Sequence, residues 1–259
     1  MVNCVAAIWS LYLYKGIGEN DMYSKYITPD KQYHLKTDKY ICNKFGLAEF
    51  FAKHYNSFNI VQGINVLDVG CGALPLGIFL ADQHKCEVTG VELNLIACDC
   101  ARENIKALNL EDSIEIINGN FVNYIEKYVG PKFDLIVANP PVDDKVASED
   151  ILKYANDTFE TLDAGSFSYL TNSWHSSEGK DLNDYIFEFG QKNLQPDGRI
   201  MIVFCTIDCS SPDYVYRKAK KYDYEIAKVV EDYISVESIG AQALGGDKIY
   251  TYMAEFRSR

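Results

Sequence analysis

The chain lacks any long run of apolar residues. Its most apolar stretch near the start, residues 4–13, is too short and too interrupted to cross a bilayer, which takes roughly 20 apolar residues. This stretch also has no basic segment before it and no small-residue cleavage site after it, so it does not resemble a secretory signal. We therefore expect no membrane association, and we expect residues 4–13 to pack as a helix or strand on the main domain.

The eight cysteines lack the spacing of a metal site. None of them forms a CxxC pair, and no histidine stands at ligand spacing from a cysteine pair, so we expect no bound metal. Cys71, Cys86, Cys98 and Cys205 lie inside apolar stretches, as reduced thiols that act as small hydrophobic residues do. A reducing cytoplasm is the simplest compartment for such a protein.

Basic residues are scarce. The chain has 25 Lys and Arg against 37 Asp and Glu, a net charge of −12. Proteins that wrap nucleic acid usually carry a basic surface, because phosphate neutralisation supplies most of their affinity. The one basic cluster, residues 217–221, is typical of a solvated helix face. Extensive nucleic-acid binding is therefore not expected, although the acidity is compatible with a single flipped base or with a partner that has its own basic patch.

What the chain does have is a regular alternation of elements. From about residue 60, short β-branched runs alternate with amphipathic stretches, which indicates βα units and a parallel sheet. The expected strands are residues 65–69, 87–92, 113–118, 133–138 and 199–204, and the clearest helices are residues 94–109 and 181–193. Two further strands, residues 224–230 and 249–256, have no long helix between them and should pair antiparallel. The predicted fold is α/β, with a seven-stranded, mostly parallel sheet and an antiparallel C-terminal strand pair.

The first forty residues differ from the rest. They are rich in tyrosine, and we expect residues 1–40 to form a small N-terminal cap over the active site of a main domain at residues 41–259. Thr37 or Asp38 is the predicted N-cap of a helix whose apolar face includes Phe45.

A glycine-rich turn follows the first strand of the main domain, in residues 66–76 (VLDVGCGALPL). Gly70 and Gly72 let the backbone bend sharply and approach a ligand closely, and Pro75 suits the first turn of a helix whose N-terminal amides face that ligand. Many such turns are only tight turns, and dinucleotide folds use a third glycine where Pro75 stands. Asp68 can meet a charged amino group, which favours S-adenosylmethionine as the cofactor. The residues of the turn that we expect to bind it are Asp68, Gly70, Cys71, Gly72, Leu74 and Pro75.

Glu92 ends the second strand and is followed by Leu93. An acid at this position of such a fold accepts hydrogen bonds from ribose hydroxyls, so we expect both residues to contact the cofactor. Alternatively, Glu92 is an exposed acid that the dipole of the next helix stabilises.

The fourth strand runs directly into an Asn-Pro-Pro sequence, within residues 133–142 (FDLIVANPPV). The two prolines hold the turn rigid, and the Asn139 side-chain carbonyl, with a neighbouring backbone carbonyl, can accept both hydrogens of a planar amino group. Holding these hydrogens turns the nitrogen lone pair toward a methyl donor, which is catalysis by positioning. We therefore predict that Asn139, Pro140 and Pro141 are catalytic and that Asn139 also borders the cofactor. An ordinary strand-ending turn is the alternative.

Together these segments resemble the class I S-adenosylmethionine-dependent methyltransferases with an (N/D)PP(Y/F/W) motif. Within that group the chain is most similar to the release-factor glutamine methyltransferases (the HemK/PrmC family), through residues 33–38 and the loop at residues 174–182. The resemblance implies a Rossmann-like fold and places Asn120 and Phe121 at the cofactor. It also implies substrate contacts from Tyr33, Thr37, Asp38, Val142 and Trp174.

Two departures from the family bear on the substrate. Val142 stands where the family has an aromatic residue, whose stacking on a base is worth about 1–3 kcal/mol. The N-terminal extension is also shorter than the helical recognition domain of the bacterial release-factor enzymes. The leading hypothesis is a methyltransferase that acts on an amide or amine nitrogen of a protein or peptide. The alternatives are a small-molecule or nucleobase N-methyltransferase and, in another class, a non-catalytic partner subunit that binds S-adenosylmethionine.

Overall fold

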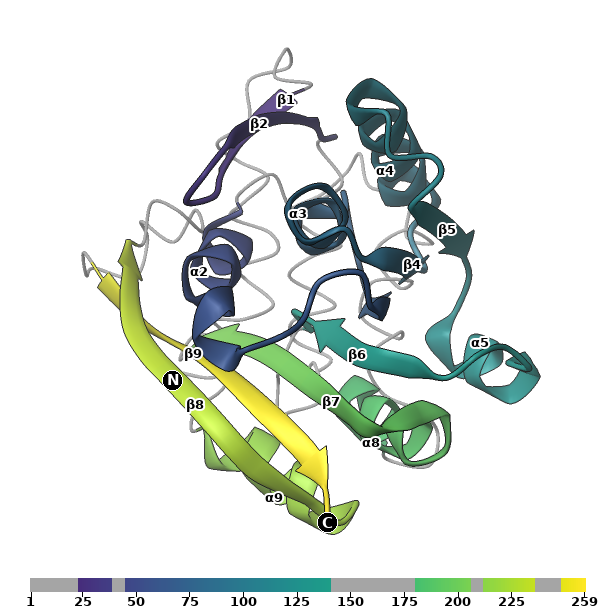
Figure 1. The fold of residues 1–259 in the computed structure, drawn as a ribbon, viewed down its shortest axis with the longest axis vertical. Helices are drawn as coiled ribbons and strands as arrows, with labels where there is room; N and C mark the ends of the chain where they lie inside the picture. Colours follow the sequence, from purple (N-terminus) through teal and green to yellow (C-terminus); the bar gives the residue numbers. More distant parts are fainter. Residues whose placement is uncertain (1–22, 39–44, 141–179, 206–211, 236–247) are drawn as a thin grey trace, which may run out of the picture.

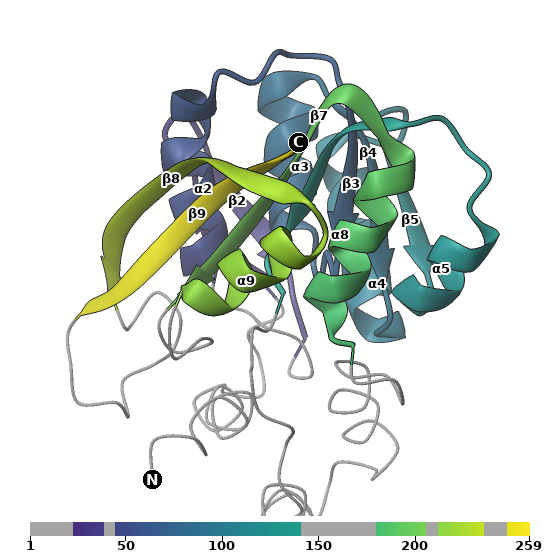
Figure 2. The ribbon, with the colours of Figure 1, turned by 90° about the horizontal axis from the view of Figure 1, so that it is seen from below.

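The computed structural model describes residues 23–38, 45–140, 180–205, 212–235 and 248–259. Its centre is a seven-stranded sheet with the strand order β5-β4-β3-β6-β7-β9-β8, covered by helices on both faces (Figures 1 and 2). The strands are β3 (Asn65–Val69), β4 (Glu87–Glu92), β5 (Ile114–Asn118), β6 (Phe133–Ala138), β7 (Leu194–Cys205), β8 (Tyr224–Ser235) and β9 (Lys248–Ser258). The first five run parallel, and β9 pairs antiparallel with both β7 and β8, which confirms the predicted fold.

The helices divide between the two faces. They are α2 (Gly46–His54), α3 (Pro75–His84), α4 (Leu95–Leu108), α5 (Phe121–Lys127), α8 (Leu182–Asn193) and α9 (Asp213–Lys221). A short 3-10 turn, η1 (Tyr55–Phe58), follows α2. Side chains of α2, α3 and α4 form one buried cluster with the sheet, and those of α5, α8 and α9 form another. The sheet therefore separates two hydrophobic cores.

The predicted strand and helix limits hold to within two residues, except that β7 begins five residues earlier and β8 ends five residues later than predicted. The pairing of β7 to β6 shifts register, since Phe133 lies opposite Leu194 but Leu135 lies opposite Arg199. Residues 195–198, which lie between these two pairings, therefore form an irregularity inside the strand. By contrast, α4 has asparagines at both ends, where Asn94 Oδ1 accepts a hydrogen bond from Ile96 N at 3.0 Å and Asn109 takes a left-handed conformation.

The described part of the N-terminal segment is an antiparallel hairpin, β1 (Tyr23–Ile27) and β2 (Gln32–Lys36). Its buried face joins the core on the α2, α3 and α4 side, where Tyr26 and Tyr33 stack with ring centroids 5.5 Å apart. Of the predicted cap at residues 1–40, residues 1–22, with the stretch at residues 4–13, and residues 39 and 40 lie outside the described residues. The cap stays a prediction.

The predicted N-cap at Thr37 or Asp38 is wrong. The described helix begins at Gly46 with Phe45 as its N-cap residue. Thr37 instead continues the extended chain of β2, with its side chain buried and its Oγ1 atom 3.4 Å from Ser24 Oγ. Among the helices of the described ranges, none is long and apolar enough to cross a membrane.

Candidate functional site

The glycine turn lies between β3 and α3 and has an unusual backbone. Gly70 and Gly72 have φ values of 68° and 55°, and Leu74, which precedes α3, has a φ of 71°. Within the described ranges, a Cβ atom built on either glycine would meet no heavy atom within 4 Å. Among these residues the backbone of the turn therefore borders open space, as a close approach to a ligand requires.

Asp68 lies beneath this turn rather than on its surface. Its side chain is buried, and its Oδ2 atom accepts a hydrogen bond from Gly77 N in α3 at 3.1 Å. Burial raises the pKa of this carboxyl to about 7, against the lowering effect of the Gly77 bond, and the charge of Glu92 raises it further. A cationic group that reached Asp68 would favour its ionised form.

Glu92 joins the glycine turn to the start of α4. Its Oε2 atom accepts a hydrogen bond from Gly72 N at 2.9 Å, and its Oε1 atom accepts one from Asn94 N at 2.8 Å. Its main-chain oxygen accepts a third from Gly119 N at 2.9 Å. Burial raises the pKa of the Glu92 carboxyl, and the backbone donors oppose that shift. The structure thus brings the Glu92 carboxylate together with the glycine turn.

Asn120 and Phe121 follow the end of β5. The Asn120 side chain caps α5, because its Oδ1 atom accepts a hydrogen bond from Val122 N at 2.8 Å. Phe121 is buried in the core between the sheet and α8, in an edge-on contact with Phe189. Both side chains therefore hold the loop after β5 in place, and a Cβ atom built on Gly119 beside them would meet no heavy atom of the described residues within 4 Å.

Asn139 lies at the carboxyl end of β6, next to the glycine turn. Val69 of β3 is paired with Ala138 of β6, so Gly70 and Asn139 leave neighbouring strands at the same level. Asn139 is half-buried and Pro140 is buried. Three other predicted site residues, Pro141, Val142 and Trp174, lie outside the described residues.

The structure does not bring Tyr33 to this site. Its hydroxyl donates a hydrogen bond to Asp82 Oδ2 at 2.6 Å and accepts one from Gln83 Nε2 at 2.9 Å, both at the C-terminal end of α3. The glycine turn precedes the other end of that helix, roughly 15 Å away at 1.5 Å per residue. Thr37 and Asp38 follow Lys36, whose main-chain N and O atoms hydrogen bond to Asn104 of α4.

One site residue was missed by the sequence analysis. Asn104 in the middle of α4 is buried and hydrogen bonds to Ala73 O in the glycine turn at 3.1 Å. A polar amide within the apolar stripe of a predicted helix was the signal that could have identified it.

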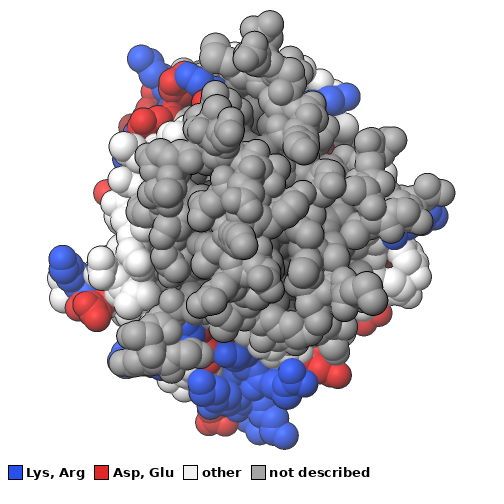
Figure 3. Space-filling model, turned by 180° about the vertical axis from the view of Figure 1, so that it is seen from behind, with Lys and Arg blue, Asp and Glu red and all other residues white. Residues whose placement is uncertain are grey.

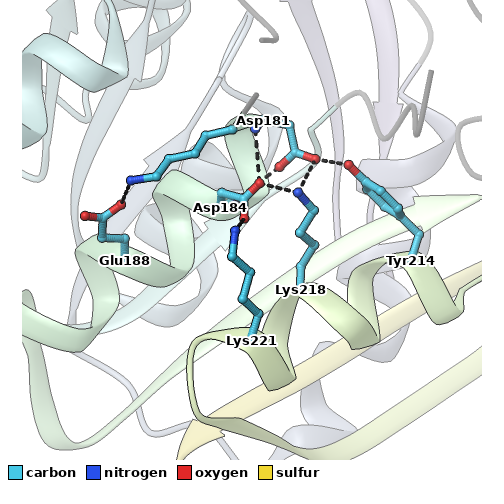
Figure 4. A network of polar contacts seen from close by, with 7 residues as sticks. Asp181, Asp184, Glu188, Tyr214, Lys218 and Lys221 are labelled. Carbon is cyan, nitrogen blue, oxygen red and sulfur yellow. Dashed lines mark hydrogen bonds and ion pairs between the residues drawn. The ribbon is translucent and has the colours of Figure 1, made fainter. Parts of the chain in front are cut away.

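The start of α8, which follows the loop at residues 174–182, is held by a network of charges (Figure 4). Asp181 and Asp184 form a capping box, with Asp184 N donating to Asp181 Oδ1 at 2.9 Å and Asp181 N to Asp184 Oδ2 at 3.2 Å. Lys218 of α9 contacts both carboxylates, Lys221 contacts Asp184 at 2.8 Å, and the Tyr214 hydroxyl donates to Asp181. The basic cluster of α9, which is visible as a blue patch in Figure 3, is therefore partly neutralised by α8.

The residues at the carboxyl ends of β3, β4 and β5 fit S-adenosylmethionine. Gly70, Gly72 and Gly119 leave open space, while the Glu92 carboxylate can accept hydrogen bonds from hydroxyls and Asp68 can balance a positive charge.

Comparison with known proteins identifies the domain. Residues 47–161 match the family model described as the methyltransferase small domain. Residues 47–161 are therefore similar to a methyltransferase domain. The chain is 36% identical to a release factor glutamine methyltransferase of Fusobacterium nucleatum, over 67% of this chain and 45% of the relative. It is 38% identical to a tRNA1(Val) (adenine(37)-N6)-methyltransferase of Porphyromonas gingivalis, over 29% of this chain and 31% of the relative.

A solved structure agrees in fold with this methyltransferase domain. A SAM-dependent methyltransferase from Thiobacillus denitrificans, in complex with S-adenosyl-L-homocysteine, matches with a TM-score of 0.51 at 12% identity, over 83% of this chain and 98% of that one. The chain spans less than half of the length of the curated relatives named above. One of these relatives is named for tRNA, so the comparisons do not support the prediction that extensive nucleic-acid binding is absent.

Proposed function

We propose that the protein transfers a methyl group from S-adenosylmethionine to an amide or amine nitrogen of a protein or peptide. The observation that carries this proposal is the place of Asn139. It leaves β6 beside the point where β3 enters the glycine turn, since Val69 and Ala138 are paired. A nitrogen held at Asn139 therefore lies one strand, roughly 5 Å, from the backbone that would hold the methyl donor.

Asn139 acts by orienting the acceptor. Its side-chain oxygen accepts one N–H of the substrate, and the adjacent main-chain carbonyl accepts the other, so the nitrogen lone pair points at the donor. S-adenosylmethionine supplies an electrophilic methyl group when it is bound. Glu92 holds its hydroxyls, and Asp68 balances its positive charge. Asn120 and Phe121 keep the loop after β5 in place around it.

The match to the release-factor enzyme supports a protein substrate. It extends over 67% of the chain, whereas the match to the tRNA enzyme covers 29%. The tRNA match supports a nucleobase as the second candidate acceptor. Substrate contacts from Val142 and Trp174, catalysis by Pro141 and a location in the cytoplasm also stay predictions.

The test is the Asn139→Ala variant. We expect methyl transfer to fall by at least about a thousandfold, because the variant loses the orientation of the acceptor, while the Kd for S-adenosylmethionine stays within about twofold. Transfer is measured with labelled cofactor and cell extract, and the Kd by calorimetry. Asn123→Ala, an exposed asparagine on α5, is the matched control.

The outcomes separate the candidates. A labelled product that protease removes and RNase leaves supports a protein acceptor, and the reverse result supports a nucleobase. A product that survives both treatments indicates a small molecule. Binding of S-adenosylmethionine without any transfer would identify a non-catalytic subunit, and equal loss of binding and transfer in Asn139→Ala would make Asn139 structural.

A further inference from the structure

Asn104 connects three segments that are far apart in the sequence. Its Oδ1 atom accepts a hydrogen bond from Lys36 N at 2.6 Å, at the end of the N-terminal hairpin. Its Nδ2 atom donates to Lys36 O and to Ala73 O, both at 3.1 Å. One amide in α4 therefore pairs with both main-chain groups of Lys36 and with the glycine turn.

The hydrogen bonds of Asn104 lie in a buried and largely apolar environment. Its side chain is buried, and the neighbouring buried positions of α4 are Ala97, Cys98, Cys100, Ala101 and Ile105. A buried amide among such groups is unfavourable unless its donors and acceptor are paired. All three contacts of Asn104 are to main-chain atoms, so they constrain backbone geometry directly.

The hydrogen bond to Ala73 O lies next to Leu74, the residue of the turn with an unfavourable backbone conformation. Ala73 O and Leu74 N belong to the same peptide group, and Leu74 N donates to Cys71 O at 2.8 Å. Asn104 thus holds the oxygen of a peptide group whose N–H is held by Cys71. Leu74 has a φ of 71°, a left-handed conformation that is unfavourable for a residue with a Cβ and persists only where its surroundings fix it.

The contact with Lys36 holds both main-chain groups of the residue that ends the hairpin. The Lys36 side chain also forms an ion pair with Glu103 of the same helix, with Nζ 2.5 Å from Oε1. Two consecutive residues of α4 therefore hold the end of β2.

We propose that Asn104 is a positioning residue that holds the glycine turn in its cofactor-binding conformation and ties it to the N-terminal hairpin. The hairpin is then part of the cofactor site through Asn104, and cofactor binding and the arrangement of the hairpin depend on each other. This inference rests on the proposed function, because it takes the glycine turn as the site for S-adenosylmethionine.

Two substitutions of Asn104 remove its bond to the glycine turn. Asn104→Asp keeps an acceptor for Lys36 N but places a carboxylate against Lys36 O and Ala73 O, and Asn104→Leu removes all three bonds. We expect the Kd for S-adenosylmethionine to rise about tenfold or more in both variants, because both lose the buried hydrogen bond to Ala73 O. Lys36→Met is the matched control, since it removes the Lys36 ion pair with Glu103 and leaves the main-chain bonds in place.

The Kd is measured by calorimetry on the full chain well below the Tm of each variant. A purely structural role would lower the Tm of both variants and leave the Kd unchanged, and that result would overturn the proposal. A rise in the Kd that is equally large in Lys36→Met would also overturn it, because it would assign the effect to the ion pair.

Hydrogen exchange on the unaltered protein tests the proposal where the variants do not fold. Addition of S-adenosyl-L-homocysteine should slow exchange of the Lys36 and Leu74 amides together, and protection of the turn alone would contradict the coupling. Failure of the unaltered protein to bind S-adenosylmethionine would contradict the proposed function itself. If the unaltered protein and both Asn104 variants bind S-adenosylmethionine equally well, the proposed role of Asn104 is contradicted and the proposed function is not.

Discussion

At the scale of one residue, the buried carboxyl of Asp68 in the cofactor site lowers the folding stability of the protein. In an unfolded chain an aspartate has a pKa near 4, whereas burial raises the pKa of Asp68 to about 7. The unfolded state therefore releases this proton more easily than the folded state. The penalty for folding grows as the pH rises from about 4 to about 7 and is constant above that range.

The Asp68→Asn variant removes this penalty. Its side chain cannot ionise, and it keeps an oxygen for the Gly77 N–H. We expect the Tm of the ligand-free protein to rise by a few degrees at pH 8 and to change little at pH 4.5, while cofactor binding weakens because the charge is lost. Calorimetric unfolding across this pH range is the measurement, with the exposed Asp99→Asn as control. A Tm increase that is equal at both pH values would contradict the ionisation argument.

At the scale of elements, the contact between α8 and α9 depends on charges that are balanced across the interface. The Asp184 side chain is fully buried. Burial opposes its ionisation, but hydrogen bonds from Lys218 and Lys221 outweigh burial and hold the pKa of Asp184 well below its usual range. Stability from this group is present above about pH 4 and is lost as the pH falls below that value.

Removal of one lysine should therefore destabilise the start of α8. We expect Lys218→Met to lower the free energy of unfolding by about 2–4 kcal/mol, because it leaves two buried carboxylates close together with one cation fewer. Urea unfolding at pH 7 measures the change. Lys220→Met, on the exposed side of α9, should stay within about 0.5 kcal/mol. A similar loss in both variants would show that the network with α8 is not the cause.

At the scale of the whole molecule, the net charge of −12 sets the response to salt. Like charges at the surface repel one another at pH 8, and this repulsion is screened at high ionic strength. We expect 0.5 M NaCl to raise the Tm by a few degrees at pH 8 and to have little effect near pH 5, close to the pI of about 4.8. Thermal unfolding with a dye or by circular dichroism gives the comparison. A Tm that falls with salt at pH 8 would mean that ion pairs such as Lys36–Glu103 outweigh the repulsion.

The elements of the methyltransferase domain could be predicted because their signals are local. Strand β3, the glycine turn and the helix start at Pro75 follow from β-branched residues, from positive φ at glycine and from the geometry of proline, all within a few residues. The Asn-Pro-Pro sequence after β6 is equally local. Its closeness to the glycine turn could be expected only because parallel strands of one sheet end at the same edge.

Other features depended on the packing of segments far apart in the chain. The sequence placed Tyr33 among the substrate-binding residues, but the docking of the hairpin puts it against Asp82. The same docking gives Asn104 its partners at positions 36 and 73, and the contact between α8 and α9 pairs Asp184 with Lys218. Local sequence fixes backbone conformation and the pattern of apolar residues. The partner of a buried polar group is decided by which distant surface covers it, and only the tertiary structure specifies that surface.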